Sequence, residues 1–129
     1  MRIAQVVYSW SILKNDILKF GKSFVKTTGS YLVLKGAPTI IFTPSGDALI
    51  NTTGNPSLAK FGTGDVLTGF IAGLLSQQKN IENSVVTAVY LHSLAADLLA
   101  AKRTKLDILA TDIQNYIPQT IKFLEDSIV

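Results

Sequence analysis

Hydrophobic positions divide this chain into a strand-rich first half and a helical second half. From Asn15 to Thr28 the apolar residues fit one face of a helix, and Gly29 is a typical helix stop. The segment "YLVLKG" (31–36) then predicts a buried strand. "TIIF" and "ALIN" flank the turn residues "TPSGD", which predicts two strands joined by a turn. The opening "MRIAQVVYSW" fits a strand or a helical turn equally well.

The pattern changes to helices after residue 62. A stripe of apolar residues follows, at 66, 67, 70, 71, 74 and 75, and the opposite side of this helix is small enough for another element to lie close. A second helix, from about Glu82 to Ala101, is apolar almost all round, which predicts deep burial. A third helical region begins near Thr111, a suitable N-cap, and Pro118 is expected to interrupt it.

Strands first and helices afterwards predict an α/β layered domain. The chain has no repeats and no linker, so residues 1–129 are expected to form one domain, incomplete as given. The strand that follows Gly29 has no evident partner on its other side, and an open edge of that kind invites pairing with another strand. We therefore expect the chain to be part of a larger sheet.

Composition excludes several function classes. With 47% hydrophobic and 16% charged residues among 129, the chain should be globular. The net charge of +3 comes from lysines spread along the sequence, which does not predict a nucleic-acid-binding face. Cysteine is absent and histidine occurs once, so neither a thiolate zinc site nor a histidine-based metal site is expected. No apolar run reaches membrane-spanning length and no leader pattern opens the chain, which favours a cytoplasmic protein.

The segment "FGTGD", at the mouth of the first predicted helix after residue 62, is the strongest candidate for chemistry. Free backbone amides at a helix N-terminus bind anions, and glycine lets a phosphate approach the backbone closely. Asp65 beside such a site could take the proton of a hydroxyl that attacks phosphorus. A bare G-x-G-D also fits a tight entry turn whose acid complements the helix dipole, and the segment is not a Walker A loop.

Other polar positions are less specific. Lys35 could neutralise a phosphate or form the solvated end of a strand, and "NTTGNP" (51–56) fits an ordinary loop. His92 and Asp97 are five residues apart on a predicted helix and do not share a face, whereas Ser93 and Asp97 do. We expect His92 to be a buried core histidine, and no Ser-His-Asp arrangement is indicated.

The order of these segments resembles a known family. "YLVLKGAPTIIFTPSGDALINTTGNPSLAKFGTGDVLTGFIAGLLSQ" followed by "AVYLHSLAADLLA" is similar to the C-terminal part of the ADP/ATP-dependent NAD(P)H-hydrate dehydratases, in the ribokinase-like superfamily. The resemblance covers residues 31–101 and reaches 107–128 as closing helices, whereas residues 1–14 match none of it. It implies a Rossmann-like, three-layer domain of which this chain is the C-terminal portion.

The resemblance implies a lyase that restores NADH and NADPH from their hydrated forms at the expense of ADP or ATP. The substrate hydroxyl is phosphorylated and then eliminated. Asp65 would stand at the hydrated nicotinamide as the base, with Asn55 also at the substrate, and Mg²⁺ would bridge the phosphates. The adenine nucleotide would contact Lys35, Gly36, Ala37, Pro38, Thr39, Gly62, Thr63 and Gly64.

The chain also departs from the family pattern. Lys60 and Phe61 stand where the family has small residues, so they would crowd the loop or add a phosphate contact, and Pro38 lacks a backbone N–H. The family's domain begins upstream, so we expect an enzyme piece that is inactive alone and that associates with the missing half-domain or with further copies. Two alternatives stay open: a small-molecule kinase of the same superfamily, such as a thiazole or vitamin kinase, and an inert binding module.

Overall fold

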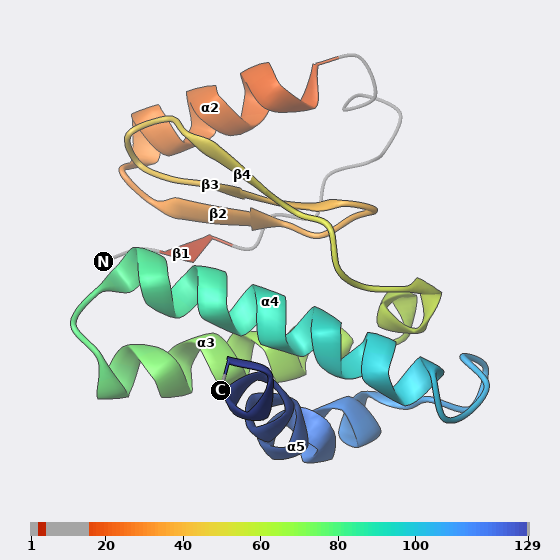
Figure 1. Cartoon of the computed structure of the whole chain (residues 1–129). Coiled ribbons are helices and arrows are strands. Elements are labelled where there is room, and N and C mark those ends of the chain that lie inside the picture. Colours follow the sequence, from red (N-terminus) through yellow and green to blue (C-terminus); the bar gives the residue numbers. More distant parts are fainter. Residues whose placement is uncertain (1–2, 5–15, 129) are drawn as a thin grey trace. The chain divides into compact units, whose positions relative to one another are not determined.

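The structure, a computed structural model, describes residues 3–4 and 16–128. They fall into two compact units that divide after Thr52. The first unit contains a sheet and one long helix, and the second contains helices only (Figure 1). The predicted order of strands first and helices afterwards is therefore confirmed.

The N-terminal unit is built on a four-stranded sheet with the order β1-β2-β3-β4. Its last three strands are antiparallel neighbours, namely β2 (Tyr31–Leu34), β3 (Thr39–Phe42) and β4 (Ala48–Asn51). The β3–β4 turn is closed by the Thr43 N–H, which donates to the Asp47 carbonyl at 3.0 Å, and Gly46 adopts a φ of 96° there. The predicted strand, turn and strand are confirmed.

The expected open edge of β2 is occupied. β1 (Ile3–Ala4) pairs in parallel with β2, so that Ile3 lies opposite Tyr31 and Ala4 opposite Leu32. The expectation of no partner was wrong because a parallel partner lies beyond a crossover and leaves no hairpin pattern in the sequence. The remainder of "MRIAQVVYSW" lies outside the described residues.

Helix α2 (Ile17–Thr28) covers one face of this sheet (Figure 1). It ends as predicted at Gly29, whose φ is 64° and whose N–H donates to the Val25 carbonyl at 2.8 Å; the expected first residue, Asn15, lies outside the described residues. Val25, Leu32 and Phe42 form the buried core between helix and sheet. Gly21 leaves room for the Phe42 ring, because a Cβ atom there would come within 2.2 Å of the Phe42 Cζ.

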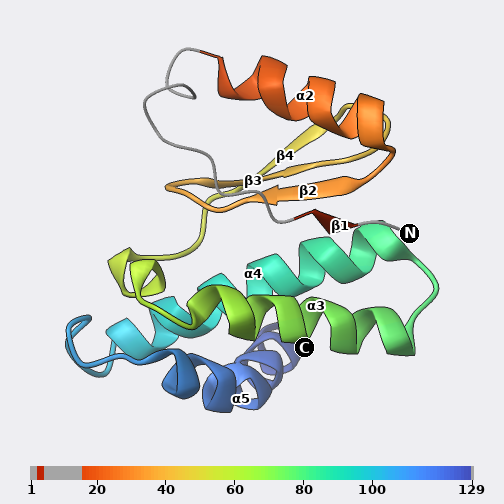
Figure 2. The same cartoon turned by 180° about the vertical axis from the view of Figure 1, so that it is seen from behind.

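The C-terminal unit consists of a short 3₁₀ helix and three long helices. They are η1 (Pro56–Ala59), α3 (Thr63–Gln77), α4 (Ile81–Ala100) and α5 (Ala110–Ile128). Helix α4 packs against both α3 and α5 (Figure 2). Its predicted burial is confirmed, His92 included, and Ala95, Ala96 and Leu99 join Ile108, Ile113 and Ile117 in one core cluster.

Helix α5 differs from its prediction at two points. It begins at Ala110 rather than after Thr111, because the Asp112 carboxylate accepts the Leu109 N–H at 2.8 Å and so caps the first turn. It also runs through Pro118 without a break. Burial of Ile117 and Thr120 on either side holds the helix across the hydrogen bond that proline cannot donate.

The small-residue side of α3 is open. A Cβ atom at Gly69 or Gly73 would have no neighbour within 4 Å among the described residues, so the predicted close approach of another element is not seen there. No helix of the described chain is both long and apolar enough to cross a membrane.

Candidate active site

The "GTGD" segment forms the start of α3, as the sequence predicts. Gly62 is the N-cap residue with a φ of 84°, a conformation that residues with a side chain rarely adopt. The first intrahelical bond runs from the Val66 N–H to the Gly62 carbonyl at 3.0 Å. The amides of Gly64 and Asp65 therefore precede the intrahelical ladder and point along the helix axis, which is the arrangement that attracts an anion.

Thr63 stabilises this turn from inside. Its side chain is buried, and its hydroxyl oxygen lies 2.7 Å from the Leu58 carbonyl oxygen and 2.9 Å from that of Lys60. The hydroxyl therefore holds the end of η1 to the start of α3. The Thr63 N–H also donates to the Lys60 carbonyl, at 3.4 Å, and a contact of Thr63 with the nucleotide stays a prediction.

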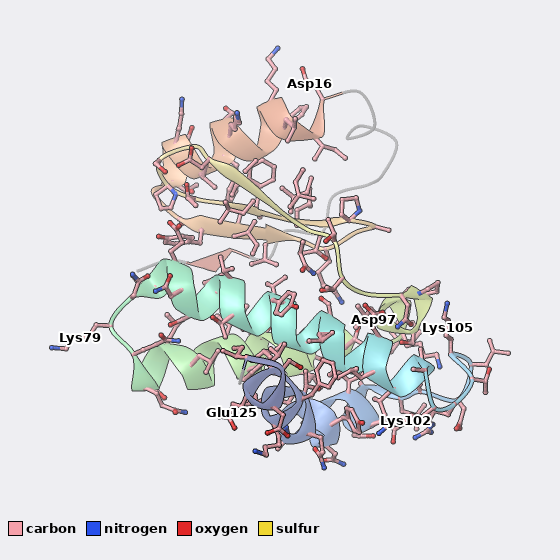
Figure 3. All side chains as sticks on the ribbon, viewed as in Figure 1. Asp16, Lys79, Asp97, Lys102, Lys105 and Glu125 are labelled. Carbon is pink, nitrogen blue, oxygen red and sulfur yellow. The ribbon has the colours of Figure 1, made fainter. Side chains whose placement is uncertain are left out.

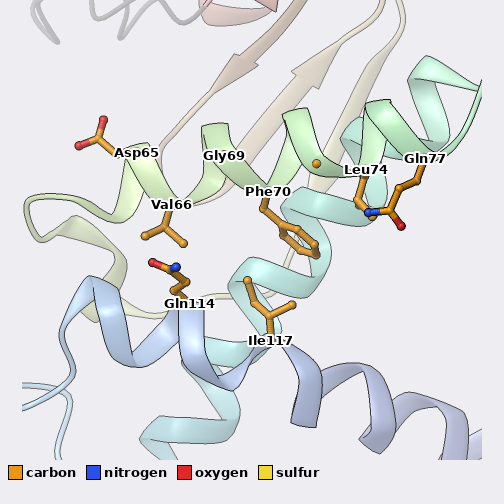
Figure 4. A pocket seen from close by; sticks show the side chains of 9 residues that line it. Asp65, Val66, Gly69, Phe70, Leu74, Gln77, Gln114 and Ile117 are labelled. Atoms are coloured by element: carbon orange, nitrogen blue, oxygen red, sulfur yellow. The ribbon is translucent and has the colours of Figure 1, made fainter.

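Asp65 is exposed in the first turn of α3. It stands at one end of a hollow of about 560 Å³ between α3 and α5, which is lined by Asp65, Val66, Gly69, Phe70, Gly73, Leu74, Gln77, Gln114 and Ile117. Figure 4 shows the Asp65 carboxylate pointing away from Gln114 and Ile117, while Val66 and Phe70 point toward them. The hollow is mainly apolar, and the acid faces outward from its rim.

Asn55 holds the segment before α3. Its side-chain oxygen accepts from the Ser57 N–H at 3.0 Å and from the Ser57 hydroxyl at 2.7 Å, so Asn55 caps η1. Its amide nitrogen donates to the Asp97 Oδ1 at 2.8 Å. Both ends of this side chain are thus used within the protein, and a contact with substrate stays a prediction.

Asp97 is a functional candidate that the sequence reading missed. Its Oδ2 accepts the Gly54 N–H at 2.7 Å, so one carboxylate binds two consecutive residues of the "GNP" segment. Figure 3 labels Asp97 on α4, at the end of the helix that contacts η1. The available signal was a carboxylate in the second, mainly apolar half of α4.

The expected crowding or phosphate contact at Lys60 and Phe61 is not what the structure shows. The Lys60 ammonium donates to three backbone carbonyls of the α4–α5 connection, those of Lys105, Leu106 and Ile108. Phe61 is fully exposed, with a relative accessibility of 104%. The Lys60 ammonium is therefore bound within the protein, and Phe61 does not fill the loop.

The predicted nucleotide residues 35–39 lie in the N-terminal unit, in the connection from β2 to β3. Lys35 is half-buried, Gly36, Ala37 and Pro38 are exposed, and the Ala37–Pro38 peptide bond is cis. The Thr39 hydroxyl lies 3.4 Å from the Gly36 carbonyl oxygen. These residues belong to the first unit, whereas Asn55 and residues 62–65 belong to the second.

Comparisons with a family model and with known proteins all point to the same family. The family model described as NAD(P)H-hydrate dehydratase matches residues 2–119, so the expectation that the first 14 residues lie outside the resemblance was wrong for residues 2–14. A bifunctional NAD(P)H-hydrate repair enzyme of Moorella thermoacetica is 36% identical over 90% of this chain and 22% of its own. The ADP-dependent (S)-NAD(P)H-hydrate dehydratase of Bacillus subtilis is 37% identical over 88% of this chain and 41% of its own.

A solved structure supports the fold directly. The crystal structure of the Bacillus subtilis ADP/ATP-dependent NAD(P)H-hydrate dehydratase, co-crystallised with ATP and Mg²⁺ and soaked with CoA, superimposes with a TM-score of 0.82 at 36% identity. It is matched over 85% of this chain and 41% of that one. This chain thus spans less than half of the length of the relatives that it matches.

Proposed function

Because this chain belongs to the NAD(P)H-hydrate dehydratase family, we propose that it supplies the phosphate-binding loop and the catalytic base of an ADP- or ATP-dependent dehydratase that restores NADH and NADPH from their hydrated forms. The observation that carries the proposal is the start of α3. There, Gly62 begins the helix with left-handed backbone angles, and the outward-directed amides that follow lie next to one exposed carboxylate, that of Asp65. That combination serves a reaction in which a phosphate and a proton are handled side by side.

The proposed chemistry assigns one task to each group. The Asp65 carboxylate accepts the proton of the substrate hydroxyl as that oxygen bonds to the terminal phosphorus of the nucleotide. The amides at the start of α3, those of Gly64 and Asp65, bind the phosphate oxygens, whose negative charge grows as the bond to the leaving nucleotide breaks. The bond between the ring carbon and the phosphorylated oxygen then breaks, and phosphate leaves with the electron pair. The neighbouring ring carbon loses a proton to water, which restores the double bond.

We assign the reacting hydroxyl to the outer side of α3, because the Asp65 carboxylate points to that side (Figure 4). The hollow between α3 and α5 lies behind that carboxylate and is lined mainly by apolar groups (Figure 4). Asp65 could not reach a hydroxyl deep in the hollow without changing its side-chain conformation. The remaining walls of the substrate pocket would therefore be residues other than those lining this hollow.

In this proposal the chain's residues bind the nucleotide directly, whereas the metal ion is bound by the nucleotide. We assign Lys35, Gly36, Ala37, Pro38 and Thr39 to the adenylate part of the nucleotide, as in the resemblance. Among residues 3–4 and 16–128, no group of three or more His, Cys, Asp or Glu side chains is placed to hold a metal ion. This fits Mg²⁺ that arrives bound to the nucleotide phosphates, where it neutralises their charge.

We further propose that the active unit includes the rest of the family's domain. The family match runs across both compact units of this chain, which supports treating residues 1–129 as part of one domain. The Bacillus subtilis dehydratase has more than half of its length outside the match. The partner we expect is a chain or segment with that remaining half, rather than a nucleic acid or a membrane.

The test is an absorbance assay with hydrated NADPH, ADP and Mg²⁺, on the chain alone and with the upstream part of a relative, alongside calorimetry of Mg·ADP binding. We expect Asp65→Asn to lower turnover by about 10²- to 10⁴-fold because the proton acceptor is lost. Glu82→Gln is the matched control, since Glu82 is an exposed acid in the first turn of α4.

Each other outcome points elsewhere. Unchanged turnover in Asp65→Asn would refute the role of Asp65 as proton acceptor. A stable phosphorylated product without recovery of reduced-nicotinamide absorbance would favour the small-molecule kinase. Absence of both nucleotide binding and turnover, in a folded chain with its upstream part, would favour the inert binding module.

A further inference from the structure

Lys60 ends the short helix η1 and lies two residues before the N-cap of α3. Its Nζ is 3.0 Å from the Lys105 carbonyl oxygen, 2.7 Å from that of Leu106 and 2.6 Å from that of Ile108. An ammonium group has three N–H donors and no acceptor. All three donors are accounted for by backbone carbonyls of one connection.

These three carbonyls belong to a segment that is also held by the Arg103 side chain. The Arg103 side chain donates to the Asp107 carboxylate at 2.8 Å and to the Asp107 carbonyl at 3.1 Å. It also reaches the Asp112 carboxylate at 3.3 Å, and that carboxylate caps α5. The α4–α5 connection therefore presents converging carbonyl dipoles on a supported backbone, to which a single compact cation is well suited.

The same residue reaches the α3 turn from its backbone. The Lys60 carbonyl oxygen lies 2.9 Å from the Thr63 hydroxyl. Gly62, two residues on, lies close to the first residue of α5, since a Cβ atom at Gly62 would come within 3.2 Å of the Ala110 Cβ. Lys60 thus joins the α4–α5 connection to the loop that begins α3.

We propose that the Lys60 ammonium positions the "GTGD" loop through its hydrogen bonds to the carbonyls of the α4–α5 connection, and that Lys60 is not a phosphate ligand. The inference rests on the proposed function in one respect, that this loop binds nucleotide phosphate. A loop held in its binding geometry before the ligand arrives loses less entropy on binding. Removal of the ammonium should therefore weaken nucleotide binding although Lys60 makes no contact with the nucleotide.

The experiment measures Mg·ADP affinity by calorimetry for the 129-residue chain and for its Lys60→Ala variant, and amide hydrogen exchange over residues 60–66 for both. We expect Kd to rise about tenfold or more in Lys60→Ala and exchange in the loop to accelerate by a similar factor. Ammonium chloride should restore both, because the free ion fits the vacated carbonyls. Tetramethylammonium chloride at the same ionic strength should not, because it has no N–H donor.

Two further variants separate positioning from charge and from general instability. Lys102→Ala removes one positive charge from the same connection but none of the three carbonyl contacts, and should leave Kd unchanged within twofold. Lys60→Arg keeps the charge but replaces the compact ammonium by a planar fork, so it should recover only part of the affinity.

The outcomes are distinguishable. Affinity and exchange in Lys60→Ala equal to those of Lys102→Ala would overturn the proposal, and so would a loss that ammonium and tetramethylammonium restore equally. If the unaltered chain binds no Mg·ADP even when the upstream part of a relative is added, the proposed function fails. Ammonium-dependent exchange in residues 60–66 then decides the role of Lys60 by itself.

Discussion

Asp97 offers a direct test of how the segment before α3 is held. Its carboxylate accepts the Gly54 N–H at 2.7 Å and the Asn55 amide at 2.8 Å, and Asn55 in turn caps η1. A hydrogen bond to a charged group contributes about 1.5–3 kcal/mol, and leaving a donor without an acceptor adds to the loss. Gly54 is exposed, so water can replace part of its bond. We therefore expect Asp97→Ala to cost about 3 kcal/mol, near the lower end for two such bonds.

The stability of Asp97→Asn should lie between that of the unaltered chain and that of Asp97→Ala. It keeps one acceptor oxygen for Gly54, but its new amide group would face the Asn55 amide, donor against donor. Turning Asn55 over would relieve that conflict only by withdrawing the oxygen that accepts from Ser57. We expect a cost of about half that of Asp97→Ala.

The assay is thermal unfolding followed by helical circular dichroism. For a chain of this size a loss of about 3 kcal/mol corresponds to a fall in Tm of about 10 °C. Asp126→Ala is the control, because Asp126 forms an exposed pair with Lys122 at 2.6 Å and such pairs contribute about 0.2–1 kcal/mol. A Tm for Asp97→Ala within the range of Asp126→Ala would refute the assignment of Asp97 as the anchor of residues 54–57.

Three further substitutions test the packing of the two units. Gly21→Ala should destabilise the protein by about 3 kcal/mol because its Cβ would meet the Phe42 ring at 2.2 Å. Gly73→Ala, in open space on α3, should stabilise it by up to about 1 kcal/mol. Urea unfolding compares the two variants, and equal effects would contradict the close contact of Gly21 with Phe42. Pro118→Ala should stabilise α5 by about 1–3 kcal/mol, because the helix regains a bond to the Gln114 carbonyl; a lower urea midpoint would show that proline fits its site better than the helix argument allows.

Local pattern was sufficient for most elements. α2 with its Gly29 stop, the β3–β4 hairpin and the buried α4 each follow from spacing within a dozen or so residues. The start of α5 was misplaced because its cap is not the hydroxyl of Thr111. It is the Asp112 carboxylate reaching back to Leu109, and burial beside Pro118 outweighs the helix-breaking tendency of proline.

The partners of the site residues could not be predicted in the same way. Lys60 bonds to residues 45 to 48 positions later in the chain, and Asp97 to residues 42 and 43 positions earlier. Periodicity carries no information on such contacts, so a lysine beside a glycine-rich loop suggested a phosphate ligand. "GTGD" itself was recognisable because its geometry is local: a left-handed glycine, a helix start and an acid within four residues.

The polar side chains around η1 form hydrogen bonds within the protein, and this affects which positions tolerate substitution. Asn55, Ser57, Lys60 and Thr63 are all bound within the C-terminal unit. Phe61 projects fully into solvent between two of them. A large residue can replace a small one at this position without displacing the backbone amides of α3. We therefore expect this chain to accept side chains of different size at position 61 with the geometry of the turn unchanged.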